Sequence, residues 1–113
     1  MKKLLFALAP VALFAATAAE ARPARCVVSS AGTPTYRGPC DFLAERGGSF
    51  SISPARGAFP GGISDISVSL IAPGVAEVRG LTSGGINSRW GEARRSSRDR
   101  ACWIGEDFSI CVY

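Results

Sequence analysis

Histidine is absent from this chain of 113 residues. Its absence removes the commonest general base, the Ser-His-Asp and Cys-His nucleophile systems, and the imidazole ligands of most protein metal sites. No phosphate-binding Gly-x-x-x-x-Gly-Lys loop is present, and the adjacent acidic pair Glu106-Asp107 stands where a hairpin turn favours polar residues. The sequence therefore predicts a protein that is not an enzyme, with no catalytic residue, metal or cofactor.

Lysine is nearly absent too, because Lys2 and Lys3 are the only two. They precede the apolar run Leu4–Ala16, and Ala19-Glu20-Ala21 follows with the small residues that a signal peptidase prefers. The run is too short for the roughly 20 residues that span a bilayer. We therefore predict a signal peptide over residues 1–21, cleaved after Ala21 (or, as the alternative, after Ala18), and a periplasmic or secreted product with no membrane span.

Residues 22–113 carry eleven arginines against eight acidic residues, a net charge of +3. This excess is modest, and nucleic acid is not an expected partner in the envelope. Ninety-two residues make one domain with a small core, because a chain of this size buries only about two-thirds of its unfolded surface. Covalent cross-links are therefore expected to stabilise the domain.

Four cysteines can supply these cross-links, since an even number in a short exported chain indicates disulfides. A turn centred on Glu106-Asp107 places Cys102 directly opposite Cys111, within bridging distance, and leaves Cys26 to pair with Cys40. The alternative is a four-thiolate metal site. The spacings do not resemble the close C-x₂₋₄-C pairs of zinc sites, so the disulfides are favoured.

Gly and Pro recur every 8–12 residues, and no stretch keeps a helical apolar period over three turns. The expected strands cover residues 26–29, 35–43, 49–53, 64–70, 76–79, 86–94 and the two sides of the 102–111 hairpin. We therefore predict an all-β fold of seven to nine short strands, either an antiparallel sandwich or a barrel-like meander. Residues 54–62, rich in Pro and Gly, are expected to form an irregular loop.

Face matching also predicts how two hairpins pair. A three-residue loop, Ala72-Pro73-Gly74, sets Leu70 opposite Ala76 and keeps the apolar residues of both strands on one face. In the 102–111 hairpin the same argument sets Trp103 opposite Ile110, in the core.

An arginine cluster surrounds Trp90 and is the candidate binding surface. Its guanidinium groups can bind carboxylate or phosphate bidentately, and an indole adds a stacking face. The alternatives are a solvated hairpin loop for the arginines and a core position for Trp90. On a regular strand Arg89 and Arg94 would lie on opposite faces, so a shared surface needs a bulge at Gly91 or help from loop 95–99. The candidate residues are Arg89, Trp90, Arg94, Arg95 and Arg98, with Arg100 nearby.

The segments Gly80–Arg95, with its Ser-Gly-Gly-Ile-Asn-Ser-Arg-Trp-Gly-Glu core, and Ala101–Cys111 resemble uncharacterised small exported proteins of Gram-negative bacteria. The resemblance implies export and brings no activity with it. Periplasmic lysozyme inhibitors are similar in size and compartment, but Ser83-Gly84-Gly85-Ile86 matches their Ser-Gly-x-x-Tyr loop only in part. The expected function is non-catalytic binding of a protein partner or an anionic ligand of the envelope. The alternatives are a lysozyme-inhibitor-like protein and a histidine-independent lyase or nuclease that uses Arg, Glu and Tyr.

Overall fold

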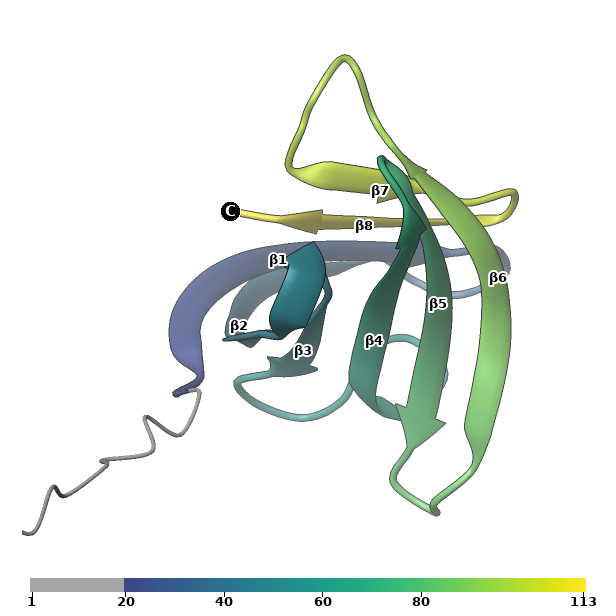
Figure 1. Cartoon of the computed structure of the whole chain (residues 1–113). Helices are drawn as coiled ribbons and strands as arrows, with labels where there is room; N and C mark the ends of the chain where they lie inside the picture. The colour runs from purple at the N-terminus through teal and green to yellow at the C-terminus, as the bar shows by residue number, and fades with distance from the viewer. Residues whose placement is uncertain (1–19) are drawn as a thin grey trace, which may run out of the picture.

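The structure, a computed structural model, describes residues 20–113 and shows a closed barrel of eight antiparallel strands (Figure 1). Most of the predicted signal peptide lies outside the described residues. The all-β prediction is confirmed, and of the two expected architectures the barrel is the one found. The strands are β1 (Arg22–Ser30), β2 (Tyr36–Ala44), β3 (Phe50–Pro54), β4 (Ile63–Ala72), β5 (Val75–Thr82), β6 (Asn87–Arg95), β7 (Cys102–Ile104) and β8 (Phe108–Val112), with a short 3-10 helix, Arg46–Gly48, between β2 and β3.

The barrel closes where β1 pairs with β8, the strand farthest from it in the sequence. Cys26 lies opposite Val112 and Ser30 opposite Phe108. Beyond the last pair, Arg25 and Tyr113 exchange two backbone hydrogen bonds, of 3.0 and 2.8 Å. Each strand of the barrel therefore has a neighbour on both sides, which removes the unpaired edges that invite aggregation.

Alternating residues of the strands fill the interior, as the period of a half-buried strand requires. Val28, Ile66, Val68, Val78 and Ile110 are all completely buried. Burying one such side chain stabilises the fold by about 1.5–3 kcal/mol. An eight-stranded barrel is just wide enough to be filled by its own side chains or to hold one small ligand.

Both predicted hairpin registers are confirmed. Trp103 lies opposite Ile110 and is 4% exposed, and Leu70 lies opposite Ala76. The turn between β4 and β5 is one residue shorter than expected, because Ala72 still pairs with Val75. A register shift between Leu70 and Ala72 absorbs the difference and keeps the apolar residues on the inner face.

The two predicted disulfides are present and occupy different environments. Cys26 and Cys40, with Cα atoms 5.8 Å apart, belong to the hydrophobic core. Cys102 and Cys111 lie directly opposite each other on β7 and β8, with Cα atoms 4.0 Å apart. Their neighbours in the strands, Trp103 and Ile110, belong to the core, so this second bridge lies on the outer face of the sheet.

Residues 55–62 form a loop without helix or strand, as the sequence predicts, although Pro54 belongs to β3. Phe59 is 2% exposed, and its backbone forms a bridge with Ile63. Its ring meets that of Tyr36 edge to face, with centroids 4.9 Å apart. The loop thus returns a large aromatic side chain to the core at one end of the barrel. The buried position of Phe59 was not predicted, because a high Pro and Gly content indicates an irregular backbone and says nothing about which single side chain is buried.

Candidate functional site

The barrel has two ends with different chemistry. In an antiparallel meander the starts of odd strands and the ends of even strands gather at one end. We call this end the mouth; it includes the start of β1 and the ends of β6 and β8. Phe59, Tyr36, Trp90 and Phe108 gather at the opposite end, which we call the plugged end.

A cavity of about 410 Å³ opens at the mouth. This volume lies within the range of about 300–1,000 Å³ that is usual for small-molecule sites. Apolar and aromatic side chains are combined with three arginines, and no Asp or Glu side chain is among the lining residues of this cavity. The lining residues are Arg22, Pro23, Ala24, Phe42, Gly48, Phe50, Arg95, Arg100, Ala101, Trp103, Val112 and Tyr113.

One wall of the cavity comes from β1, β2 and β3. Arg22 and Phe42 are paired across β1 and β2, and the guanidinium carbon of Arg22 lies 4.7 Å from the centroid of the Phe42 ring. The rings of Phe42 and Phe50 are 5.2 Å apart. A cation held over an aromatic face keeps its N–H groups at the ring edge free to bind an anion.

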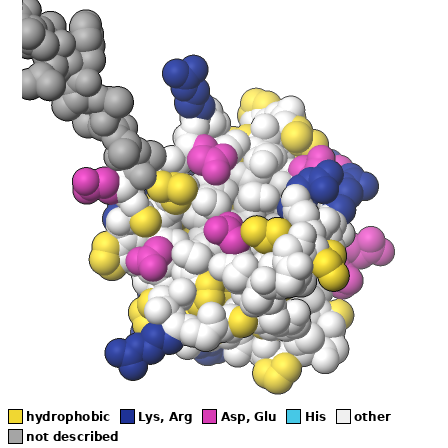
Figure 2. Space-filling view, turned by 90° about the horizontal axis from the view of Figure 1, so that it is seen from below, with side chains coloured by type: hydrophobic (Ala, Val, Ile, Leu, Met, Phe, Trp, Pro, Cys, Tyr) yellow, Lys and Arg dark blue, Asp and Glu magenta, His cyan; other side chains and the backbone are white. Residues whose placement is uncertain are grey.

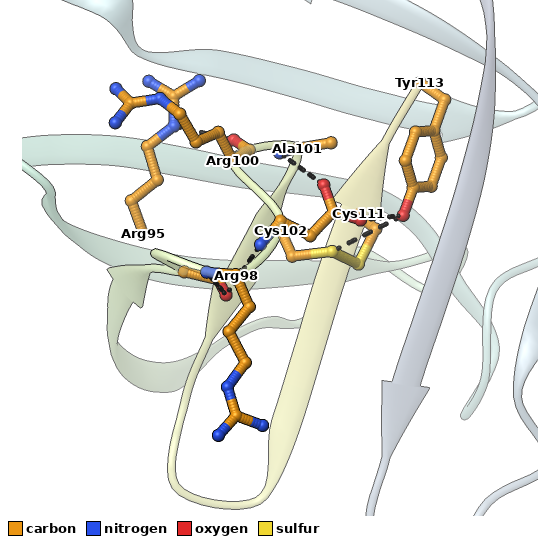
Figure 3. The surroundings of a disulfide bond; sticks show 9 residues. Arg95, Arg98, Arg100, Ala101, Cys102, Cys111 and Tyr113 are labelled. Carbon is orange, nitrogen blue, oxygen red and sulfur yellow. Dashed lines mark hydrogen bonds between the residues drawn. A yellow bond between two sulfur atoms is a disulfide. The ribbon is translucent and has the colours of Figure 1, made fainter.

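The facing wall comes from β6, β7 and the loop between them. The guanidinium carbon of Arg95 lies 5.7 Å from the centroid of the Trp103 ring, and Arg95 Nε donates a 2.8 Å hydrogen bond to the carbonyl oxygen of Arg100. This bond uses one N–H of Arg95 and leaves its two terminal nitrogens available. In Figure 3 the guanidinium groups of Arg95 and Arg100 lie on the same side of the loop, whereas that of Arg98 points away.

The loop that carries Arg100 is held by Asp99. One carboxylate oxygen accepts a 3.0 Å hydrogen bond from the backbone N–H of Ala101, and the other accepts a 2.6 Å bond from the hydroxyl of Tyr113. The bond from Tyr113 and then that from Ala101 lower the pKa of Asp99, and the same carboxylate raises the pKa of Tyr113. Arg100 is therefore positioned between two hydrogen-bonded residues (Figure 3).

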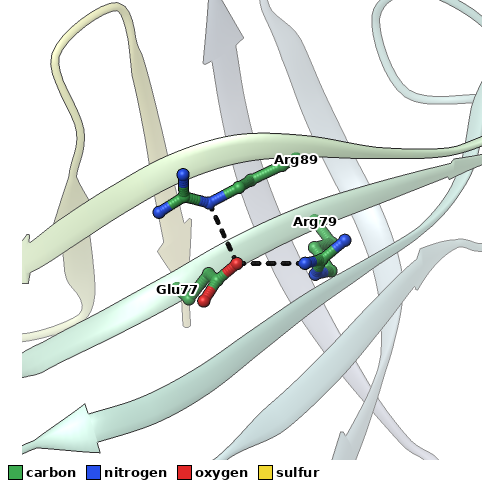
Figure 4. A network of polar contacts seen from close by, with 3 residues as sticks. All are labelled: Glu77, Arg79 and Arg89. Atoms are coloured by element: carbon green, nitrogen blue, oxygen red, sulfur yellow. Dashed lines mark hydrogen bonds and ion pairs between the residues drawn. The ribbon is translucent and has the colours of Figure 1, made fainter.

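Arg89 and Arg94 point to the outer surface, and neither lines the mouth cavity. Arg89 Nε is 3.0 Å from a carboxylate oxygen of Glu77, which also contacts Arg79 at 3.2 Å (Figure 4). Arg94 contacts Glu92 at 3.4 Å. These two predicted site residues are therefore paired with acids, and the acidic and basic groups seen in Figure 2 are likewise dispersed over the surface.

The bulge that a shared arginine surface requires is present in β6. Val78 pairs with Gly91 but Arg79 pairs with Arg89, so Trp90 is the additional residue, and Gly91 has a φ of 120°. The bulge turns Arg89 to the outer face, where Arg94 also lies, and so places it on the face opposite to Arg95. The predicted cluster is thus divided between the outer face (Arg89, Arg94), the mouth (Arg95) and the loop (Arg98).

Trp90 belongs to the plugged end. It is partly buried against the core, and its ring meets Phe108 edge to face with centroids 5.5 Å apart. A Cβ atom at Gly80 would lie 2.7 Å from the indole nitrogen, so glycine is needed where β5 passes the indole. Trp90 and Arg89 also line a second cavity of about 170 Å³ with Ser30, Asp107 and Phe108. This small cavity lies at the opposite end from the three arginines of the mouth.

The sequence prediction did not include Arg22, Phe42 and Phe50 in the candidate site. It also did not foresee that Arg95 and Arg100 are hydrogen-bonded and line the same cavity. A usable signal was present: Arg22 shares the inward alternation of Cys26 and Val28, and Phe42 that of Cys40. An arginine and an aromatic residue at the end of inward-facing runs indicate a polar opening to an apolar interior. Which strand ends meet there depends on barrel closure, which local pattern does not reveal.

No family model, curated protein or solved structure matches the chain. Within residues 20–113, no helix has the length and apolar character needed to cross a membrane. In the same part of the chain, no group of three or more Cys, Asp or Glu side chains is placed to hold a metal ion.

Proposed function

We propose that the protein is an exported, non-catalytic binding protein, periplasmic or secreted after cleavage behind Ala21, and that its mouth takes a small anionic ligand with an apolar or aromatic body. The observation that carries this proposal is the mouth cavity itself, where Arg22, Arg95 and Arg100 surround aromatic walls. The two disulfides are compatible with an oxidising compartment.

The two parts of the ligand follow from the two parts of the lining. Guanidinium groups bind carboxylate, sulfonate or phosphate oxygens through paired N–H donors. Phe42, Phe50 and Trp103 line the cavity and give it an apolar part, against which a ring or a short hydrocarbon chain can pack. Because the cavity is partly apolar, hydrogen bonds to the charged group are stronger there than on an open surface.

A pair of fluorescent probes tests the proposal directly. Anilinonaphthalene sulfonate carries an aromatic body and one anionic group, and N-phenylnaphthylamine has the same body without the sulfonate. We expect the sulfonate to bind the folded protein more tightly than the neutral probe, and its affinity to fall with added salt as screening increases. Both affinities are measured by fluorescence titration.

Matched double variants show whether the mouth is the site. R95Q/R100Q and R89Q/R94Q change the net charge equally, but only the first pair lines the mouth. We expect R95Q/R100Q to weaken sulfonate binding by about tenfold and leave the neutral probe unchanged, since each exposed charge contributes up to about 1 kcal/mol. Equal losses in the two double variants, or none in either, would contradict the proposal.

A further inference from the structure

The start of β1 forms part of the mouth. The hydrogen bonds between β1 and the segment after β8 begin at Arg25, which bonds to Tyr113. The three residues before it, 22–24, pair with β2 alone. Arg22, Pro23 and Ala24 all line the cavity. The predicted cleavage after Ala21 would make Arg22 the first residue of the protein. The new N-terminus would then belong to a residue that already borders the cavity.

Cleavage at this position changes the charge at the mouth in two ways. Before cleavage the nitrogen of Arg22 is a neutral amide, and Glu20 lies two residues away, at most about 7 Å along the chain. This separation is shorter than the Debye length of roughly 8 Å at physiological salt, so the charge of Glu20 is not fully screened from Arg22. Cleavage removes this negative charge and creates a positive α-ammonium group on Arg22.

We propose that removal of residues 1–21 completes the anion site: the α-ammonium group of Arg22 joins the guanidinium groups of Arg22, Arg95 and Arg100 in binding the ligand, and the opposing carboxylate of Glu20 leaves. This inference rests on the proposed function of the mouth. It implies that the precursor binds anions more weakly than the mature protein, although the barrel is the same in both.

Because of the composition of the domain, the titration of the α-ammonium group can be distinguished from that of the other groups. Residues 22–113 contain no histidine and no lysine, and the described cysteines are all in disulfides. Among the titratable groups near the start of β1, Asp41 lies opposite Pro23 and Glu45 follows the end of β2, while Tyr113 lines the cavity and is bonded to Asp99. The pKa of Asp99 is lowered and that of Tyr113 is raised, so neither shift brings a group into the range from about pH 6 to 9.5. An α-amine, with a usual pKa of about 7.7–8.0, changes charge within this range.

The test compares chemically matched forms of the domain, since residues 22–113 contain all eight strands, both disulfides and the core. One form begins at Arg22 with a free amine. A second is the same protein treated with the N-hydroxysuccinimidyl ester of acetic acid, which acetylates the α-amine selectively because no lysine is present. A third keeps Glu20 and Ala21 behind an acetylated initiator methionine, and a fourth adds E20Q to the third.

Binding of anilinonaphthalene sulfonate is measured for each form from about pH 6.5 to 9.5. At the acidic limit we expect acetylation to weaken binding about twofold to fivefold, and the extended form with Glu20 to be weaker by about threefold to tenfold. E20Q should return the extended form to the level of the acetylated domain. The affinity of the free-amine form should fall to that level as the pH rises through about 8, whereas the acetylated forms show no such change.

Equal affinity of all four forms across this pH range would overturn the inference and leave the proposed function standing. A difference that persists unchanged at the alkaline limit would also overturn it, because the effect would then be steric. Failure of the sulfonate to bind any of the four forms would overturn the proposed function, and this inference with it.

Discussion

The two ends of the barrel are made from the same strands but are filled by different side chains. At the plugged end, Phe59 returns from its loop into the core and packs against Tyr36, and Trp90 packs against Phe108. At the mouth, Arg22 and Arg95 lie over Phe42 and Trp103, and a cavity remains. The aromatic pairs of the plugged end meet edge to face, whereas at the mouth Phe42 and Trp103 each have a guanidinium group over the ring. From this comparison we expect substitutions of the aromatic rings at the plugged end to affect stability, and those at the mouth to affect the proposed ligand binding.

Replacing one aromatic residue by alanine at each end should give the largest difference between the two ends in stability and in probe binding. F59A removes a fully buried ring and should lower the free energy of unfolding by about 3–5 kcal/mol, while the affinity for anilinonaphthalene sulfonate stays the same. F42A removes a partly buried ring, so it should cost less stability and weaken probe binding severalfold. Denaturant unfolding and probe titration measure the two quantities. The comparison fails if F59A weakens binding as much as F42A does.

The disulfides offer a second contrast, with a somewhat smaller effect. Loop closure alone predicts that each bridge contributes roughly 3 kcal/mol. C26A/C40A also leaves a void in the core, so it should destabilise more than C102A/C111A, whose bridge lies outside the core. Only C102A/C111A should also weaken binding of the sulfonate probe, because this bridge is next to the loop that carries Arg100. Unfolding in denaturant and mass spectrometry of non-reduced peptides check stability and pairing; a Cys40–Cys102 link would contradict the pairing.

The two tryptophans report on the two ends and locate the probe without large changes in stability. In W90F the fluorescence of Trp103, which lines the mouth cavity, should be strongly quenched by energy transfer to bound anilinonaphthalene sulfonate. In W103F the remaining Trp90 lies at the plugged end and should be quenched less. We expect about a twofold difference in transfer efficiency between the variants, measured at saturating probe. Equal quenching, or stronger quenching of Trp90, would place the probe outside the mouth.

The smallest expected effect concerns acid sensitivity at the mouth. The pKa of Asp99 is lowered by its bond from Tyr113, so its stabilising contribution is present above the usual carboxyl pKa and is lost as the pH falls through the lowered value. Y113F should therefore lower the melting temperature at neutral pH, by less than about 4 °C, and the difference from the unsubstituted protein should disappear in strong acid. Y36F is the matched control, because its hydroxyl donates to the carbonyl oxygen of Pro39 and not to a carboxylate. A Y113F difference that persists in strong acid would contradict the assignment.

The hairpins were predictable from the sequence because their evidence is local. Val68 and Val78, or Trp103 and Ile110, share a face only in one register, and the turn residues agree with it. The mouth was not predictable in the same way, because Arg22 and Arg95 are brought together by pairing between β1 and β8. The bulge at Gly91 was foreseen as a condition and does set Arg89 on the outer face with Arg94, but the place of Arg95 at the cavity, on the inward side of β6, was not foreseen. The burial of Phe59 was not predicted, because it lies in a segment whose composition indicates only an irregular loop.

The pairing of β1 with β8 also fixes when the barrel can form during synthesis. A chain that emerges N-terminus first completes the β1–β2 hairpin early, and the Cys26–Cys40 bridge joins residues only 14 apart. The other side of β1 stays unpaired until residues 108–112 have emerged, since no earlier strand replaces β8. Contacts between such distant segments slow folding, and the waiting edge is open to other chains. The growing chain is therefore expected to be most exposed to aggregation just before residues 108–112 emerge, and a truncation that removed β8 would leave this edge of β1 unpaired.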